Sequence, residues 1–162
     1  MSPAKPSKAS RVEMTEIVMP EDTNPFGHIF GGRVMTLIDK AAAIAAMRHA
    51  RANVVTASVD RLTFRAPVRL GQILRIYAAV NATFSTSMEV GVKVMSEDPH
   101  TGRQAHCCSA YVTMVSLDRD GRPSQVARLA ATGAPERRRQ REAAARRRSR
   151  LGEKRRHRGP GA

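Results

Sequence analysis

The spacing of apolar positions along the chain changes near residue 50. Residues 30 to 50 are apolar and rich in alanine, which predicts one helix of about 20 residues and about 30 Å. Beyond it, short β-branched stretches are separated by turn residues, a pattern typical of strands. Every second residue from Met88 to Val94 is apolar, and Glu, Gly and Lys stand between them. This alternation indicates a strand with one buried face and one wetter face.

The order of these elements predicts an α+β fold. Four antiparallel strands follow the helix, and a short strand is also expected near Thr15 to Met19. The strands need a cover for their apolar face, and the helix at 30 to 50 is the only apolar helix in the sequence. We therefore expect a hotdog fold, in which a curved antiparallel sheet wraps one long central helix.

Charge divides the 162 residues into unequal parts. The net charge is +14, and residues 135 to 162 contain 12 Lys or Arg but 3 Asp or Glu, with no aromatic residue. A segment of this composition cannot bury enough apolar surface to order itself, although its Ala, Arg and Glu centre can form transient helix. We expect a disordered N-terminus over 1–12, a folded domain over 13–126 and a basic, disordered tail over 127–162. The tail is either a solvated segment or a surface that attracts RNA, anionic lipid or an acidic partner.

Several classes of protein are disfavoured by the composition. No apolar run approaches the roughly 20 residues that span a bilayer, and the N-terminus lacks the apolar core of a secretory signal. Cys107 and Cys108 are adjacent, so they form no disulfide framework and lack the spacing of metal ligands. We expect a cytoplasmic protein with two buried strand cysteines and with neither a metal nor a redox cofactor.

One carboxylate interrupts the apolar helix. Asp39 stands in the stretch LIDKAAAIAA, and an unpaired carboxylate costs several kcal/mol when it is buried. Lys40 points about 100° away from it around the helix, and the neighbours four residues away, Met35 and Ala43, carry no charge. Asp39 is therefore a candidate for chemistry. Two alternatives remain, in which it faces solvent or pairs with an arginine from a strand.

Four segments resemble the hotdog acyl-CoA thioesterases of the YciA and brain acyl-CoA hydrolase type. They are MPEDTNPFGHIFGGRVMTLIDKAAAIAA, VVTASVDRLTFRAPVRLGQIL, STSMEVGVKV and AYVTMVSLDRDGRP. The resemblance covers roughly residues 14 to 126, and its most specific part is N-x-x-G-x-x-F-G-G followed seven residues later by D. It implies hydrolysis of acyl-CoA to free fatty acid and CoA. It also implies a catalytic Asp on the helix, here Asp39, and an Asn in the preceding loop, here Asn24.

Thioester hydrolysis requires an activated nucleophile and donors for the oxyanion. Asp39 can act as general base toward water or attack directly to form an anhydride, and the sequence leaves both open. Asn24 can orient the water or the carbonyl. Gly31 and Gly32 lie at the predicted helix start, where free N–H groups can bind an oxyanion. Their alternative role is close packing of the helix against the sheet.

The same resemblance implies ligand contacts and an assembly. The segment STSMEV corresponds to the part of the family that lies near CoA, so Thr86 and Ser87 are candidate CoA-binding residues, with an exposed turn as the alternative. Arg61 and Arg65 have strand spacing and could steer the anionic ligand, or form a solvated face. In the family, Asn and Asp meet across a dimer interface, and the dimers usually form a hexamer as a trimer of dimers.

Two other functions fit parts of the sequence. Hotdog dehydratases and hydratases of acyl-thioesters typically use a His with an acidic partner, and His28 is the loop candidate here. A non-catalytic protein that binds acyl-CoA or RNA would instead use the basic tail.

Overall fold

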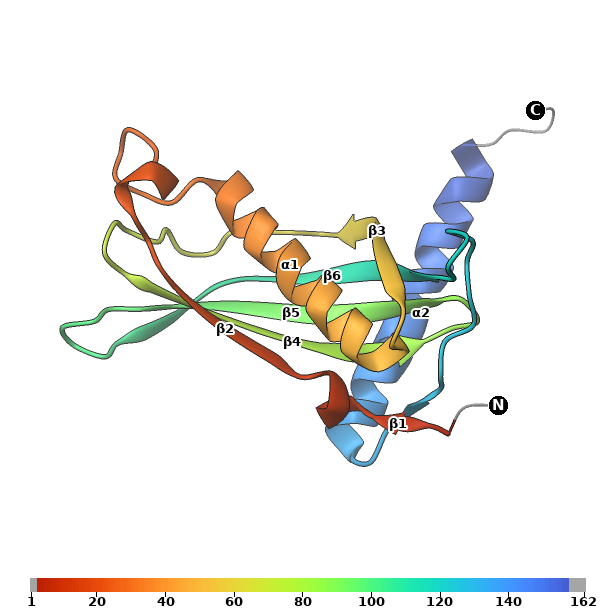
Figure 1. Cartoon of the computed structure of the whole chain (residues 1–162). Coiled ribbons are helices and arrows are strands. Elements are labelled where there is room, and N and C mark those ends of the chain that lie inside the picture. The colour runs from red at the N-terminus through yellow and green to blue at the C-terminus, as the bar shows by residue number, and fades with distance from the viewer. Residues whose placement is uncertain (1–2, 158–162) are drawn as a thin grey trace.

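The computed structural model describes residues 3–157, in which one helix lies on each face of a twisted antiparallel sheet (Figure 1). The strands of the sheet are β2 (Val12–Ile17), β3 (Asn53–Asp60), β4 (Ile73–Thr83), β5 (Ser87–Glu97) and β6 (Gln104–Leu117). Their order is β2-β4-β5-β6-β3, which places β2 and β3 at the two edges. The predicted α+β arrangement, one long helix against a curved antiparallel sheet, is confirmed.

Helix α1 (Gly31–Ala50) supplies the central layer. Half of its eight buried residues are alanines, at positions 41, 42, 45 and 46, and the others are Val34, Leu37, Ile38 and His49. Because alanine side chains are short, the helix axis can approach the sheet closely. The helix ends at Arg51, which adopts a left-handed conformation with φ of 56° and donates its N–H to the carbonyl of Met47.

The hydrophobic core lies between α1 and the inner face of the sheet. The residues of β5 that alternate from Met88 to Val94 are all buried in this core, as the pattern predicts. They pack beside the inward-facing residues of β4, such as Leu74 and Ile76, and those of β6, such as Val112 and Met114. The apolar face of the sheet is therefore covered by a single helix.

A second helix, α2 (Ala134–His157), covers part of the outer face of the sheet, behind the strands in Figure 1. Arg146 of this helix binds Glu89 of β5, whose carboxylate is 1% exposed, and Ala143 is fully buried. The sequence predicts a disordered tail and a wetter strand face at Glu89, and the structure differs on both points. The physical reason is that Glu89 and Arg146, 57 residues apart, neutralise each other. The last five residues of the expected tail lie outside the described residues.

The N-terminal segment is also tied to the domain. β1 (Lys5–Pro6) pairs in parallel with β7 (Leu129–Ala130), followed by a short 3-10 helix at Ser7–Ser10. The hydroxyl of Ser7 donates to the carbonyl of Val80 at 3.1 Å. The expected disordered segment over 1–12 is therefore ordered from residue 3 to residue 12 in this structure. A further 3-10 helix spans Pro20–Asp22. Neither α1 nor α2, within the described residues, is apolar over a stretch long enough to cross a membrane.

Candidate active site

Asn24 organises the loop that precedes α1. Its side-chain oxygen accepts the backbone N–H groups of Phe26 at 3.0 Å and His28 at 3.2 Å. Its own N–H donates to the carbonyl of His28 at 2.8 Å. Gly27, at the tip of this tight loop, has φ of 74°, which glycine adopts without steric cost. Asn24 therefore has a structural role in addition to the chemical role that the sequence suggests.

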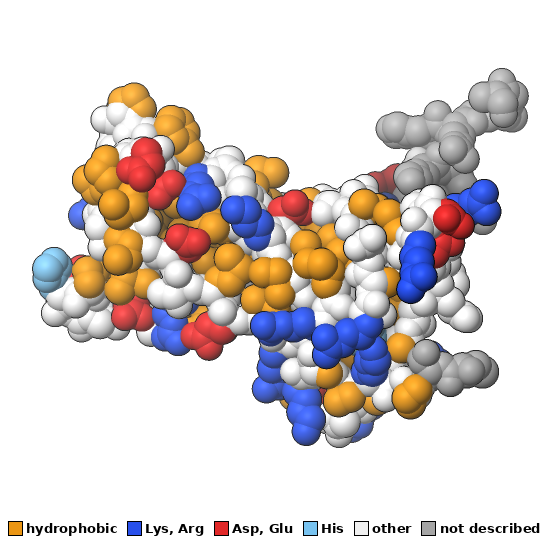
Figure 2. Space-filling model, viewed as in Figure 1, with side chains coloured by type: hydrophobic (Ala, Val, Ile, Leu, Met, Phe, Trp, Pro, Cys, Tyr) orange, Lys and Arg blue, Asp and Glu red, His pale blue; other side chains and the backbone are white. Residues whose placement is uncertain are grey.

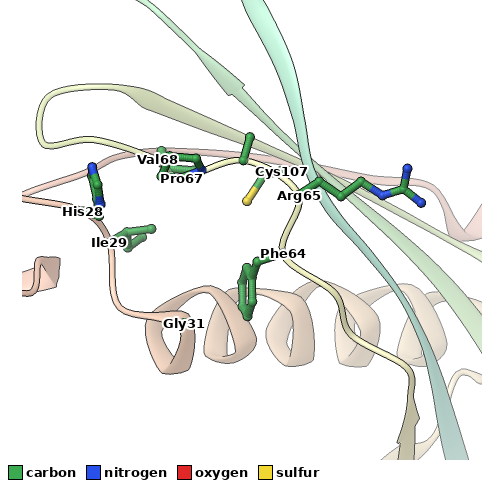
Figure 3. Close-up of a pocket in the computed structure, with 9 residues that line it drawn as sticks. His28, Ile29, Gly31, Phe64, Arg65, Pro67, Val68 and Cys107 are labelled. Carbon is green, nitrogen blue, oxygen red and sulfur yellow. The ribbon is translucent and has the colours of Figure 1, made fainter.

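A pocket of about 290 Å³ lies between this loop, the first residue of α1 and the segment after β3 (Figure 3). Gly31 and Phe64 line it, and a Cβ at Gly31 would lie 3.2 Å from the Phe64 ring. A Cβ at Gly32 would instead meet open space. Among the described residues, the N–H groups of Gly31 and Gly32 donate no hydrogen bond. Two free donors thus lie at the positive end of the helix, beside a pocket.

His28 lies in the same pocket, where Figure 3 shows it beside Ile29. A dehydratase of the expected kind needs an acidic partner for this histidine. Among the described residues that line the pocket, none is acidic. The geometry therefore offers His28 no partner for that chemistry within one chain.

Asp39 lies two turns into α1, on the face that points away from the core, and its side chain is exposed in the single chain. One carboxylate oxygen, Oδ1, accepts the hydroxyl of Thr56 at 2.5 Å. None of the ion pairs found among the described residues involves Asp39. The prediction that the Asp39 carboxylate is buried is therefore wrong for the isolated chain. Residues 37–38 and 41–42 are buried, whereas positions 39 and 40 between them lie on the opposite, exposed face of the helix.

Thr56 is a further candidate site residue, which the sequence does not reveal. It lies on β3 next to a bulge between Thr56 and Ser58, and its hydroxyl is also 3.4 Å from Sδ of Met114. Threonine is an ordinary strand residue, so nothing in the stretch VVTASVD distinguishes this one. Only the packing of β3 beside α1 shows that its hydroxyl reaches a carboxylate.

The candidate CoA-binding residues lie elsewhere. Thr86 ends the turn between β4 and β5, and Ser87 is the first residue of β5, at the opposite end of the sheet from the start of α1 (Figure 1). Arg61 and Arg65 are exposed and follow the end of β3, in a segment without strand structure. The prediction that these arginines lie on a strand is therefore wrong. Figure 3 shows the Arg65 side chain directed away from the pocket, so one chain does not bring these four residues together.

The two cysteines are buried and free on β6. A bulge at Cys107 interrupts the pairing with β5, so that both adjacent side chains turn inward. Cys107 lines the pocket, whereas Cys108 belongs to the core. The hydrogen bond with Cys107 and burial raise the pKa of Cys108, which keeps this thiol protonated and unreactive.

The chain matches a known family model, described as the thioesterase superfamily, over residues 26–103. An uncharacterized acyl-CoA thioester hydrolase of Zymomonas mobilis is 41% identical over 110 residues, which cover 68% of this chain and 74% of that protein. The chain belongs to the thioesterase superfamily. Acyl-coenzyme A thioesterase 11 of mouse is 37% identical over 92% of this chain. That protein is longer, and this chain spans only 25% of its length.

Solved structures agree with this assignment to the thioesterase superfamily. An apo-hexameric acyl-CoA thioesterase superposes with a TM-score of 0.90 and 38% identity, covering 94% of this chain and 97% of that one. An acyl-CoA hydrolase from Staphylococcus aureus was solved with butyryl-CoA, CoA and CoA disulfide. It superposes with a TM-score of 0.87 and 34% identity, covering 96% of each chain. The hotdog fold and the family resemblance inferred from the sequence are confirmed.

Proposed function

We propose that this chain hydrolyses acyl-CoA to a free fatty acid and CoA, with Asp39 as the residue that activates the attack. The observation that carries the proposal is the bond between Thr56 and Asp39. This bond holds one carboxylate oxygen of Asp39, and the other oxygen has no hydrogen-bond partner among the described residues. The first N–H groups of the same helix are free. The relatives with the same fold are acyl-CoA thioesterases.

The residues divide the reaction between them. As general base, Asp39 takes a proton from water while the water oxygen bonds to the thioester carbon. As nucleophile, Asp39 attacks the thioester carbon with its own oxygen, and water later cleaves the resulting anhydride. In either case the carbon–sulfur bond breaks, and the CoA thiolate leaves and takes up a proton. The N–H groups of Gly31 and Gly32 donate to the developing oxyanion, and the Asn24 amide orients the carbonyl or the water. No step is assigned to a metal or redox cofactor.

The related Staphylococcus aureus hydrolase supports this choice of residues. Its solved structures include variants in which an Asn, an Asp and a Thr are each replaced by Ala. Along that chain the Asp follows the Asn by 15 residues and the Thr follows the Asp by 17. Asn24, Asp39 and Thr56 have the same two spacings in this chain.

The distance along α1 favours a site built from two copies of the chain. Gly31 and Asp39 are eight residues apart on the helix, or about 12 Å along its axis, so one thioester carbonyl cannot contact both. The exposed face of α1 carries Asp39 together with Met35, which is 48% exposed. Packing of two such faces would place Asp39 of one copy near the Asn24 loop of the other. We propose a dimer-based assembly, and a hexamer by analogy with the similar hexameric thioesterase.

The CoA moiety and the location of the protein are part of the same proposal. Thr86 and Ser87 remain candidate CoA contacts, at the turn where Arg147 of α2 lies over the Phe84 ring, with 4.5 Å from Cζ to the ring centroid. Exposed Arg61 and Arg65 remain candidates for attracting the phosphates. Two buried free cysteines fit a reducing compartment, which favours the cytoplasm.

Hydrolysis of a panel of acyl-CoA substrates tests the proposal on the full-length protein. Replacement of the carboxylate in Asp39→Asn should lower kcat/KM by about 10²- to 10⁴-fold, the range for loss of a general base. Lys40→Ala, at the adjacent exposed position, is the matched control and should keep wild-type kcat/KM. Wild-type activity in Asp39→Asn would show that another group activates the nucleophile.

A further inference from the structure

A second cavity of about 680 Å³ lies on the outer face of the sheet, opposite α1. It is a groove between strands β2, β4, β5 and β6 and the N-terminal half of α2. Asp39, Thr56 and Gly31 contribute nothing to it, so it is separate from the candidate active site. Its volume falls within the range of small-molecule sites, roughly 300 to 1,000 Å³.

The groove exists because the sheet carries small residues beneath the helix. Ala79 of β4 and Gly91 of β5 are register partners and form the floor. The Asn81 amide lies over Gly91, since a Cβ at this glycine would be 2.5 Å from Nδ2 of Asn81. α2 touches the sheet further along, where Ala143 is fully buried. The space between floor and helix therefore stays open.

The charged residues along the groove favour an anion. Arg11, Lys93, Arg138 and Arg139 line it together with two acidic residues, Glu13 and Glu142. Figure 2 shows Lys and Arg side chains gathered in the lower part of the molecule, where α2 begins in Figure 1. The lining therefore carries a positive net charge.

Both acidic residues already have cationic partners. Glu13 binds Arg75 at 2.7 Å, and Glu142 pairs with Arg138 at 3.7 Å. Among the ion pairs of the described residues, none involves Arg11, Lys93 or Arg139. These three cations are available to a ligand.

One further carboxylate, Glu136, lies near Arg11 and Arg139. The pKa of Glu136 is lowered first by the backbone N–H of Thr132, and more weakly by these two arginines. Among the described residues, the Glu136 carboxylate accepts the backbone N–H and the hydroxyl of Thr132, at 2.8 and 3.0 Å. It therefore serves the start of α2 and leaves the guanidinium groups of Arg11 and Arg139 without a direct ion pair.

Aromatic walls give the groove an apolar surface as well. Tyr77 of β4 and Tyr111 of β6 both line it. Tyr111 is held in place by Arg146, whose Cζ lies 3.6 Å from the centroid of the ring. A simple inorganic anion would use the cations and leave the tyrosines and the Ala79 floor without a partner. The combination matches an anionic headgroup joined to an apolar body.

We propose that this groove binds an amphiphilic organic anion, a carboxylate or phosphate headgroup on an alkyl chain. Arg11, Lys93 and Arg139 bind the headgroup, and the alkyl chain lies over Ala79 and Gly91 between the two tyrosines. If the proposed function holds, the fatty acid released by hydrolysis is such a molecule. The identity of the natural ligand rests on that function, whereas the binding site itself does not.

Calorimetry on the full-length protein tests the groove with three probes below their micellar concentrations: laurate, dodecyl phosphate and inorganic phosphate. Dodecyl phosphate or laurate should bind, and inorganic phosphate at least about tenfold more weakly. Ala79→Leu should abolish binding because it fills the floor. Lys93→Ala and Arg139→Ala should each weaken binding about tenfold, since each removes a charge-assisted hydrogen bond.

Matched controls separate the groove from the active site. Arg103→Ala, an exposed arginine on the distant turn between β5 and β6, should leave binding unchanged. Ala79→Leu and Lys93→Ala should retain acyl-CoA hydrolysis, and Asp39→Asn should retain dodecyl phosphate binding. The thermal unfolding midpoint of each variant checks that it folds. If Ala79→Leu does not fold, Lys93→Ala, a substitution at the surface, still tests the groove.

Three results would overturn the proposal. Probe binding that is lost in Asp39→Asn but survives in Ala79→Leu would place the amphiphile in the active site. Inorganic phosphate that binds as tightly as dodecyl phosphate would remove the role of the apolar floor. A short RNA that binds more tightly than either amphiphile, with no effect of Ala79→Leu, would identify an extended polyanion surface. Absence of acyl-CoA hydrolysis in the wild type would refute the proposed function and leave the dodecyl phosphate test intact.

Discussion

A single hydroxyl orients the carboxylate on the exposed face of α1. Thr56 donates to Asp39 at 2.5 Å, and a hydrogen bond to a charged group contributes about 1.5–3 kcal/mol. Thr56→Val keeps the shape of the side chain and removes the donor, so we expect kcat to fall about 10- to 100-fold with little change in KM. Steady-state kinetics on one good acyl-CoA substrate measures both.

Thr56→Ser is the matched variant, because it restores the hydroxyl and removes only a methyl group. It should retain kcat within a few-fold of wild type. An equal loss in the Ser and Val variants would assign the effect to packing on β3 and remove Thr56 from the proposed site.

His49 makes the stability of the fold sensitive to acid. Its ring is fully buried, with Nε2 2.9 Å from the carbonyl of Ala127 and Nδ1 without a partner among the described residues. Burial lowers the pKa of His49 below its ordinary 6.5, the Ala127 carbonyl opposes this shift, and Lys5 adds to it. Below pH 6.5 the unfolded chain therefore binds a proton that the folded chain does not bind, so stability should fall as the pH decreases.

Urea unfolding followed by circular dichroism at pH 7.5 and pH 5.0 measures this effect. One such proton lowers the free energy of unfolding by at most about 1.4 kcal/mol per pH unit. His49→Gln can keep a donor toward Ala127 but cannot titrate, so it should reduce the loss at pH 5.0.

At the scale of elements, ion pairs join α2 to the sheet: Arg150 with Asp60 of β3, and Arg146 with the buried Glu89 of β5. Arg146 binds Glu89 through both carboxylate oxygens, at 3.0 and 2.7 Å, and Asn81 donates to the same carboxylate at 3.3 Å. Removing one partner leaves a buried charge alone, which typically costs 3–5 kcal/mol. Arg146→Ala should therefore lower the free energy of unfolding by about 3 kcal/mol in urea titrations.

A double variant tests whether the charge itself causes that loss. Glu89→Leu with Arg146→Met replaces the ion pair by apolar contacts and should recover most of the stability. Arg148→Ala, on the exposed side of the same helix, should change stability by less than about 0.5 kcal/mol. Equal effects at Arg146 and Arg148 would mean that α2 does not depend on this anchor.

At the scale of the whole molecule, the proposed site needs two copies of the chain. Asn24→Ala and Asp39→Asn should each be nearly inactive alone. Co-expressed, they form heterodimers in which one of the two sites combines an intact Asn24 with an intact Asp39. Random pairing then restores roughly a quarter of wild-type activity, because half of the dimers are mixed and half of their sites are intact.

Purification through two different affinity tags selects the mixed dimers for this assay. A mixture that stays as inactive as its components would mean that Asn24 and Asp39 act within one chain. The contacts within one chain make that outcome unexpected. The side-chain oxygen of Asn24 accepts N–H groups of its own loop, while Asp39 accepts the hydroxyl of Thr56 on β3.

The sequence by itself determined the parts of this protein that depend on neighbours along the chain. Alanine-rich spacing between 30 and 50 predicts α1, and the alternation from Met88 to Val94 predicts the buried face of β5. The string from Asn24 to Asp39 identifies the family and two candidate site residues. Such patterns are readable because helices and strands repeat with fixed periods, so local order alone assigns each residue to a face.

Only the tertiary structure decided what depends on residues far apart. In the sequence, Glu89 resembles a solvated strand position, but in the structure it binds Arg146, which lies 57 residues later in α2, within the expected disordered tail. Thr56 is a candidate for the site because its hydroxyl donates to Asp39, 17 residues earlier in the sequence. Asp39 itself is exposed in the single chain rather than buried. These contacts arise from the packing of whole elements against one another, and no local periodicity records which charge or hydroxyl will meet its partner.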